Sequence, residues 1–260
     1  MTDDRKTMAH NTSAVALITG GSGKIGLAIG ERLAQDGHRI VLADIAASVH
    51  AAAQTLRERA IDARAIQIDI TDAQAVSTLP EQLGDWWEDL AILINNAGIS
   101  PKVNGQKSTV MDMSLEEWDK VMAVNLTGMF LVTRTCLQSM CHRGWGRIVM
   151  IASQAARTRT AVPGAHYQTS KAGTVGFARV LAAEVAQYGI TVNSVAPGRI
   201  ESAMTAAVDA TTNSGLASSI PAARMGAPAE VAEAVAYFTG EHAGYSVGAI
   251  LDVNGGSFMP

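Results

Sequence analysis

Residues 14–30, AVALITGGSGKIGLAIG, decide the fold. The first six form an apolar run that is typical of a buried β-strand, and a helical pattern follows Gly26. Between them, Gly21, Gly23 and Gly26 have the spacing of a dinucleotide-binding loop, in which backbone N–H groups approach a pyrophosphate at a helix N-terminus. Glycines also serve ordinary turns. A glycine loop that ends a strand and opens a helix favours a nucleotide cofactor.

Apolar runs and helical patterns continue to alternate along the rest of the chain. Strands are predicted at 14–19, 39–43, 65–68, 91–95, 147–152, 191–196 and 249–253, and helices at 24–36, 46–60, 73–88, 114–143, 166–188 and 228–240. This alternation predicts an α/β fold, a single doubly wound parallel sheet with helices on both faces, over residues 14–260. We expect a flexible N-terminal segment over residues 1–13 and a substrate flap near residues 199–227.

Composition excludes several classes of protein. Of 260 residues, 48% are hydrophobic and 17% charged, which fits a packed globule rather than a disordered chain. The net charge is −4 and no basic run occurs, which argues against a nucleic-acid partner. No apolar stretch predicts a signal core or a membrane span, so we expect a cytoplasmic protein. Cys136 and Cys141 do not share one helical face, which predicts free thiols and no joint metal site.

The residue at the end of the second predicted strand bears on cofactor choice. Asp44 stands where an acid can accept hydrogen bonds from an adenosine ribose and would repel a 2′-phosphate. This favours NAD over NADP. Two alternatives stay open. Asp44 has the character of an ordinary aspartate in a solvated turn, and Lys24 in the glycine loop could attract the 2′-phosphate of NADP.

A second cluster combines a phenol with an ammonium group. Tyr167 and Lys171 lie four residues apart in a predicted helix, and therefore on one helical face. A cation near a phenol stabilises the phenolate, so we expect the pKa of Tyr167 to fall below its ordinary value of about 10. A tyrosine with a lowered pKa can act as a general acid or base. By itself, this spacing is also common in surface pairs.

Taken together, these motifs resemble the short-chain dehydrogenase/reductase family over nearly the whole chain. The motifs run in order from Thr19-Gly20 and Gly26 through Asp69, Asn95-Asn96-Ala97-Gly98, Asn125, Ser153, Tyr167-x-x-x-Lys171 and Pro197-Gly198 to Val253-Asn254-Gly255-Gly256. The resemblance implies a single Rossmann-type domain. It also implies an oxidoreductase that transfers a hydride between a secondary alcohol and a nicotinamide cofactor, NAD or NADP.

The resemblance also implies four catalytic residues. Tyr167 would be the acid/base that exchanges the substrate hydroxyl proton, and Lys171 would hold the nicotinamide ribose and lower the pKa of Tyr167. Ser153 would orient the substrate oxygen and stabilise its developing charge. Asn125 would hold a water molecule in a proton relay.

For the cofactor, the resemblance and the loop chemistry together indicate a larger set. Its members end the predicted strands or follow them: Gly20, Ser22, Gly23, Lys24, Ile25, Gly26, Asp44, Asp69, Ile70, Asn96, Ala97, Gly98, Tyr167, Lys171, Pro197, Gly198, Ile200 and Ser202. Two positions depart from the family pattern, which has glycine where Lys24 stands and threonine where Ser202 stands. A serine hydroxyl can make the same bond, whereas the Lys24 side chain could crowd the phosphates.

Substrate residues are expected around the catalytic serine and tyrosine, namely Ser153, Gln154, Arg157, Arg159, Tyr167 and Arg199, with Asn104 as a further polar candidate. Arginines bind carboxylate or phosphate groups well. His166 is expected to point away. The main hypothesis is an NAD-dependent dehydrogenase of a polar, polyol- or sugar-like and possibly anionic alcohol. The first alternative is an NADPH-dependent 3-oxoacyl-thioester reductase, and the second is a catalytically silent sensor or scaffold protein.

Assembly is predicted from surface composition. The segment Gly248–Met259 is apolar and rich in glycine, and it would be a large exposed patch on a monomer. Family members are commonly tetramers with symmetric interfaces made of such segments. We therefore expect a homotetramer whose other partner is a small-molecule alcohol or ketone.

Overall fold

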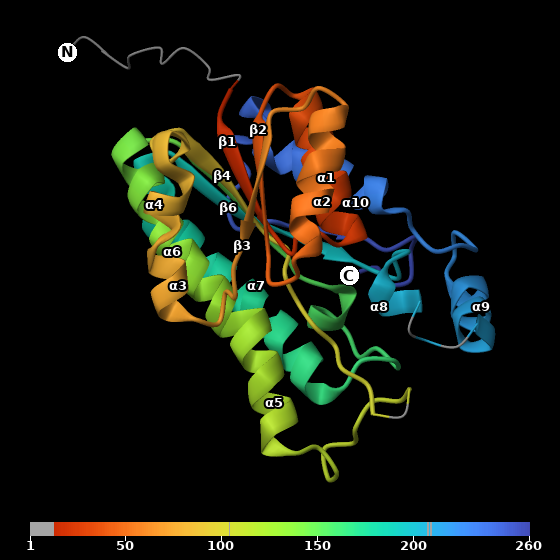
Figure 1. Cartoon of the computed structure of the whole chain (residues 1–260). Coiled ribbons are helices and arrows are strands. Elements are labelled where there is room, and N and C mark those ends of the chain that lie inside the picture. Colours follow the sequence, from red (N-terminus) through yellow and green to blue (C-terminus); the bar gives the residue numbers. More distant parts are fainter. Residues whose placement is uncertain (1–12, 104, 207, 209) are drawn as a thin grey trace.

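Seven parallel strands form one sheet in the order β3-β2-β1-β4-β5-β6-β7 (Figure 1). The strands are β1 (Val15–Thr19), β2 (Arg39–Asp44), β3 (Ala63–Gln67), β4 (Leu90–Asn95), β5 (Gly146–Ile151), β6 (Ile190–Pro197) and β7 (Ile250–Val253). This computed structural model describes residues 13–103, 105–206, 208 and 210–260. The expected N-terminal segment, except residue 13, and Asn104 lie outside the described residues. All seven predicted strands are confirmed, with ends shifted by at most two residues.

Helices cover both faces of the sheet, as the doubly wound prediction requires. One face carries α1 (Lys24–Gln35), α2 (Ser48–Glu58) and α10 (Pro228–Thr239), and the other carries α3 (Ala73–Ser77), α4 (Leu79–Leu83), α6 (Met129–Arg143) and α7 (Ala165–Val185). The helix α5 (Leu115–Met122) extends beyond the sheet, and α8 (Ala203–Ala206) and α9 (Ala210–Ser219) follow β6.

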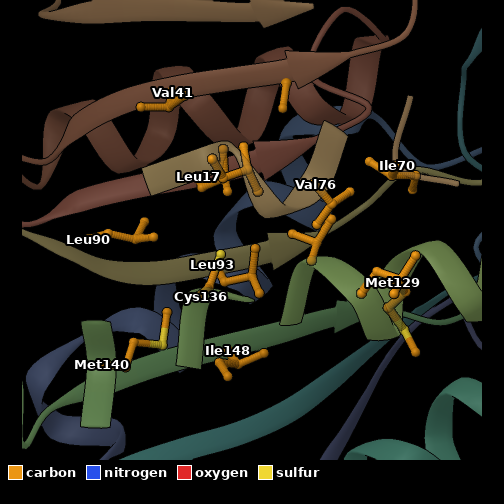
Figure 2. Close-up of a cluster of buried hydrophobic side chains, with 14 of the residues drawn as sticks. Leu17, Val41, Ile70, Val76, Leu90, Leu93, Met129, Cys136, Met140 and Ile148 are labelled. Carbon is orange, nitrogen blue, oxygen red and sulfur yellow. The ribbon is translucent and has the colours of Figure 1, made fainter. Parts of the chain in front are cut away.

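Alternation along the strands divides the core in two. In β1, Val15 and Leu17 point to the α6 and α7 side, whereas Ala16 and Ile18 point to the α1 and α10 side. All four are fully buried. Figure 2 shows the first cluster, in which Cys136 of α6 packs among strand residues. Both cysteines are free, as predicted.

Two long predicted helices are interrupted. The 73–88 segment divides into α3, α4 and a short 3-10 turn, because Pro80 has no N–H to continue a helical hydrogen-bond ladder. The 114–143 segment consists of α5 and α6 joined by a π-helical stretch, Ala123–Gly128, that contains Asn125. π-helical stretches often occur at functional sites. The predicted flap also contains regular structure, namely α8 and α9.

The strand order reverses beside β1, which pairs with β2 on one side and with β4 on the other. In parallel sheets, the crevice beyond the carboxyl ends of the strands at such a reversal is where ligands bind. The topology therefore brings the glycine loop, the residues after β4 and the residues after β5 to one edge of the sheet.

Candidate active site

The glycine loop after β1 is built from glycines with different constraints. Gly20 has a φ of +64°, and a Cβ at Gly26 would lie 2.4 Å from the Gly20 carbonyl oxygen. Side chains are therefore excluded at both positions by the protein itself. At Gly23, which precedes α1, the nearest atom to a Cβ would be 3.4 Å away. Lys24 is the first residue of α1 and is exposed, so its side chain does not disturb the packing of the loop.

A clamp between the ends of β1 and β4 fixes the floor of the crevice. The Thr19 hydroxyl accepts hydrogen bonds from the backbone N–H groups of Asn96 (3.0 Å) and Ala97 (3.1 Å). In return, the Asn96 side-chain amide donates to the carbonyl oxygens of Thr19 (2.9 Å) and Gly20 (3.0 Å). The residues after β4 therefore hold the glycine loop in place and line the crevice at the same time.

Asp44, at the end of β2, is also bound to this loop. Its Oδ2 accepts from the Ser22 hydroxyl at 2.7 Å and from the Ser22 N–H at 3.1 Å, and its Oδ1 accepts from the Ala46 N–H at 3.1 Å. Asp69 is held in a similar way, because its Oδ1 accepts from the hydroxyl and the N–H of Thr71 at 2.7 and 2.8 Å. Both carboxylates are thus oriented by local bonds before any ligand arrives.

A cleft of about 520 Å³ runs along this edge of the sheet. Every residue that the sequence predicted for the cofactor lines it, from Gly20 to Ser202. The cleft also has an apolar wall that sequence reasoning missed, which includes Ile45, Ile68 and Val124. Ile45 is 63% exposed, directly after Asp44. A glycine cradle, oriented carboxylates and an apolar wall fit the phosphates, ribose and adenine of a dinucleotide.

Lys171 is a buried amine at the centre of the site. Its side chain, on α7, is only 4% exposed, and its Nζ donates a hydrogen bond to the Ile151 carbonyl oxygen at 2.7 Å. Burial lowers the pKa of Lys171 to about 8. The amine is therefore fixed against the end of β5, close to Ser153 in the chain.

Asn125 connects the π-helical stretch to the loop after β4. Its Oδ1 accepts from the Ile99 N–H at 2.8 Å, and its Nδ2 donates to the Ile99 carbonyl oxygen and to the Ser170 hydroxyl, both at 3.0 Å. These bonds fasten the loop after β4 to α7. They give Asn125 a positioning role that sequence alone does not show.

The pKa of Tyr167 in the chain without a cofactor is raised rather than lowered. Burial raises the pKa of the phenol above its ordinary value of 10, and only a hydrogen bond with the Ser153 side chain opposes this. The Lys171 amine is 5.8 Å from the centre of the tyrosine ring and is directed to a backbone carbonyl group. In the chain alone, desolvation outweighs this hydrogen bond, so the lowered pKa stays a prediction for the enzyme with the positively charged nicotinamide ring bound.

A second cavity of about 340 Å³ adjoins the cleft. The candidate substrate residues Ser153, Gln154, Arg159, Tyr167 and Arg199 line it. Gln154 is held by Ser257 near the C-terminus, whose hydroxyl donates to Gln154 Oε1 at 2.7 Å. The structure thus brings five of the six predicted substrate residues together.

Arg157 is the exception among the substrate candidates. Its guanidinium group lies 3.3 Å from the Asp252 carboxylate of β7 and over the Phe258 ring, and it does not line the cavity. The prediction failed because sequence distance from Ser153 does not show which way the loop turns. Arg157 instead attaches this loop to the C-terminal strand.

His166 points away from the site, as expected, and is fully buried. Its Nε2 lies 2.9 Å from Glu117 Oε1 on α5, and its Nδ1 accepts the Tyr167 N–H at 2.6 Å. His166 therefore joins α5 to the start of α7.

Sequence reasoning placed the insert at residues 99–111 near the substrate but gave Lys102 in it no role, and it missed most of the apolar part of the cavity. Lys102 lies in the loop after β4 and lines the cavity together with Val162, Met204, Leu216 and Ile220. The signal for Lys102 was its place shortly after the Asn-Asn-Ala-Gly motif. The apolar residues belong to segments that only the fold brings together.

No helix in the described part of the chain has the length and apolar character needed to cross a bilayer. Within the same described residues, no group of three or more His, Cys, Asp or Glu side chains is arranged to hold a metal ion.

Two glycines allow the cradle to be tested. Gly26→Ala should destabilise the fold, because a Cβ would lie 2.4 Å from a backbone oxygen. Gly23→Ala should fold normally and weaken NAD binding, because this position faces the cleft. Thermal unfolding and NAD titration of both variants measure this, with Gly176→Ala, which has open space around it, as the control. Unchanged NAD affinity in Gly23→Ala would count against the cradle.

The buried amine predicts a particular pH dependence of stability. At pH values below 8, both the folded and the unfolded chain carry the Lys171 proton, and the cost of burying this charge is fully present. Between pH 8 and 10.5 the folded chain loses the proton before the unfolded chain does, so the contribution of Lys171 to the free energy of unfolding rises with pH.

Urea unfolding at about pH 7 and about pH 9.5 tests this. Wild type should gain stability relative to Lys171→Met by on the order of 2 kcal/mol over this interval. A constant difference between the two proteins at both pH values would show that the amine does not titrate with a lowered pKa.

Comparisons with known proteins show the family of this chain. The sequence model of the short chain dehydrogenase family matches residues 14–213. The 3-oxoacyl-[acyl-carrier-protein] reductase of Haemophilus influenzae is 37% identical over 94% of this chain and 98% of its own length.

Solved structures of similar proteins indicate the same family. A 3-oxoacyl-[acyl-carrier protein] reductase from Brucella melitensis with bound NAD is similar with a TM-score of 0.88 and 33% identity, over 95% of this chain and 92% of its own. A putative NAD(P)-dependent gluconate 5-dehydrogenase from Beutenbergia cavernae with bound NADP has a TM-score of 0.86 and 31% identity, over 94% and 96%. The chain is an oxidoreductase that belongs to the short-chain dehydrogenase/reductase family.

Proposed function

We propose that this protein interconverts a 3-oxoacyl thioester and its 3-hydroxy form, with NAD(H) as the redox cofactor. One observation carries the reaction type: Ser153 and Tyr167 line both the 520 Å³ cleft and the 340 Å³ cavity. Two hydroxyl groups at the junction of a dinucleotide cleft and a substrate cavity are placed to meet the reacting carbonyl oxygen.

Each of the four candidate catalytic residues then has a defined role. The nicotinamide ring supplies or accepts the hydride when the cofactor is bound. The Ser153 hydroxyl orients the substrate oxygen, and the Tyr167 phenol gives a proton to this oxygen in reduction or removes it in oxidation. The Lys171 amine, fixed by Ile151, adds positive charge near the phenol. Asn125 keeps the loop after β4 against α7, and its part in a proton relay stays a proposal.

The substrate proposal departs from the first hypothesis of the sequence analysis, a polyol-like alcohol. Relatives named as 3-oxoacyl reductases favour the alternative, at 37% identity over nearly the full length. The cavity supports it as well, because Val162, Met204, Leu216 and Ile220 offer apolar contacts for an acyl group. A sugar-acid dehydrogenase is the second candidate, because Lys102, Arg159 and Arg199 line the same cavity.

A substrate screen separates these candidates. Acetoacetyl-CoA should be reduced with NADH faster, by kcat/KM, than D-gluconate or D-glucitol is oxidised with NAD. Efficient turnover of gluconate and none of the thioester would establish the second candidate instead.

The free thiols favour a reducing compartment, and we propose that the protein acts in the cytoplasm.

Removal of the phenol should abolish most of the activity. Tyr167→Phe should lower kcat by about two or more orders of magnitude, the usual scale for acid–base catalysis, while NAD still binds. Ser153→Ala should also slow turnover with little effect on NAD affinity. Steady-state kinetics and NAD titrations of both variants measure this. Near-normal turnover of Tyr167→Phe would mean that another group carries the proton. A wild-type protein without any turnover would favour the alternative of a catalytically silent sensor or scaffold protein.

Asp44 should set the preference for NAD. Its carboxylate lines the cleft and repels a 2′-phosphate, so wild type should have a higher kcat/KM with NAD than with NADP. Asp44→Asn should reduce this preference while it keeps acceptor and donor groups beside Ser22. Equal kcat/KM values for both cofactors in wild type would contradict the proposal and point to Lys24, which lines the same cleft, as a phosphate partner.

We further propose that the protein is a homotetramer. Several large apolar side chains are exposed near the C-terminal edge strand and on α7, among them Val180 (60%), Val247 (41%) and Met259 (75%). Burial of such side chains between copies would remove apolar surface from water. Light scattering at micromolar concentration should give four times the chain mass of 27.2 kDa. A monomeric mass would refute the assembly.

A further inference from the structure

The substrate cavity is lined by cations and by no acid among the described residues. Lys102, Arg159 and Arg199 line it, and its other described lining residues are uncharged. The chain as a whole carries a net charge of −4, so this local excess of positive charge is not an average property of the surface. Cations gathered in a cavity favour a ligand of opposite charge.

Two of these cations are held in place by neutral partners. The Lys102 Nζ donates to the carbonyl oxygen of Val162, which lies 60 residues later in the chain and also lines the cavity. The Arg199 guanidinium donates through Nε to Asn213 Oδ1 on α9 at 3.0 Å. Asn213 is itself fixed, because its Nδ2 donates to the carbonyl oxygens of Thr205 (2.9 Å) and Val208 (2.8 Å). Both cations are therefore oriented by neutral groups, and no carboxylate of a described residue pairs with either of them.

Lys102 and Arg199 both lie in surroundings that disfavour their positive charge. Burial lowers the pKa of both residues, and repulsion from Lys107 and Arg199 lowers the pKa of Lys102 further. Lys102 and Arg199 are both only half-exposed, so water screens their repulsion incompletely. An anionic oxygen group between them would relieve the repulsion and would accept charge-assisted hydrogen bonds.

We propose that Lys102 and Arg199 form an anion-binding subsite that recognises a carboxylate or phosphate group of the substrate. The inference rests on the proposed function only in taking this cavity as the substrate site. The anionic group has two sources, either the free carboxylate of an oxo or hydroxy acid or the phosphates of a CoA thioester. The subsite adds recognition of this anionic group. The Ser153 and Tyr167 hydroxyls do not provide such recognition, because they act on the reacting oxygen.

A binding experiment tests the subsite independently of turnover. Acetoacetate, its uncharged ester ethyl acetoacetate and acetoacetyl-CoA are titrated calorimetrically into the protein with NAD present, so that the ketones are not reduced. The variants are Lys102→Gln and Arg199→Gln, which keep N–H donors and remove the charge. Lys107→Gln is the matched control, because the exposed Lys107 donates to the neighbouring Ala161 carbonyl oxygen at 2.6 Å and does not line the cavity.

Each subsite variant should weaken the binding of a charged probe by about tenfold, the usual scale for a lost charge-assisted bond. Ethyl acetoacetate should be unaffected, and Lys107→Gln should resemble wild type. An effect on acetoacetate identifies the carboxylate as the anion, and an effect on acetoacetyl-CoA alone identifies the phosphate. Equal affinities of all proteins for both charged probes, or an equal loss for the uncharged ester, would overturn the proposal.

Salt dependence covers the case in which a variant does not fold. The affinity of wild type for the charged probe should fall as NaCl is raised, while that for ethyl acetoacetate should not. Identical salt responses of the two ligands would overturn the subsite. Because both measurements report binding, a protein that binds the anion but does not turn over acetoacetyl-CoA would contradict the proposed function and leave the subsite standing.

Discussion

The hydrogen bond between the Lys171 amine and the Ile151 carbonyl oxygen is the constraint on which the site depends. It attaches α7 to the last residue of β5, two positions before Ser153. Tyr167, one helical turn before Lys171, is thereby brought to the same edge of the sheet. Asn125 strengthens the arrangement from the other side, because its bonds to Ile99 and Ser170 hold the loop after β4 against α7. The geometry of the candidate site is thus a consequence of how α7 meets the end of β5.

Much of the fold could be predicted because its determinants are local. An apolar run such as residues 90–95 has no alternation of polarity, and this is the property of a strand covered on both faces. The four-residue spacing of Tyr167 and Lys171 defines a shared helical face without any knowledge of the fold. Motifs that end a strand were located correctly for the same reason, since parallel strands end at one edge of the sheet.

What could not be predicted depends on contacts between distant segments. Arg157 follows Ser153 closely, but the loop turns it to Asp252, almost a hundred residues later in the chain. Lys102 could not be given a role because its partner Val162 belongs to another loop. The raised pKa of Tyr167 in the chain alone could not be predicted for a related reason. Spacing shows that a cation is near, but the amount of water removed from the phenol depends on every segment that covers it.

We propose that burial dominates the pKa of the Tyr167 phenol in the chain alone, and that positive charge beside the phenol makes Tyr167 an effective acid/base. The ionisation of Tyr167, followed by ultraviolet difference titration of wild type against Tyr167→Phe with and without NAD, tests this most directly. We expect a pKa above 10 for the chain alone and a lower value when NAD, with its positively charged nicotinamide ring, is bound. A value below 10 without NAD, or one that NAD leaves unchanged, would contradict it.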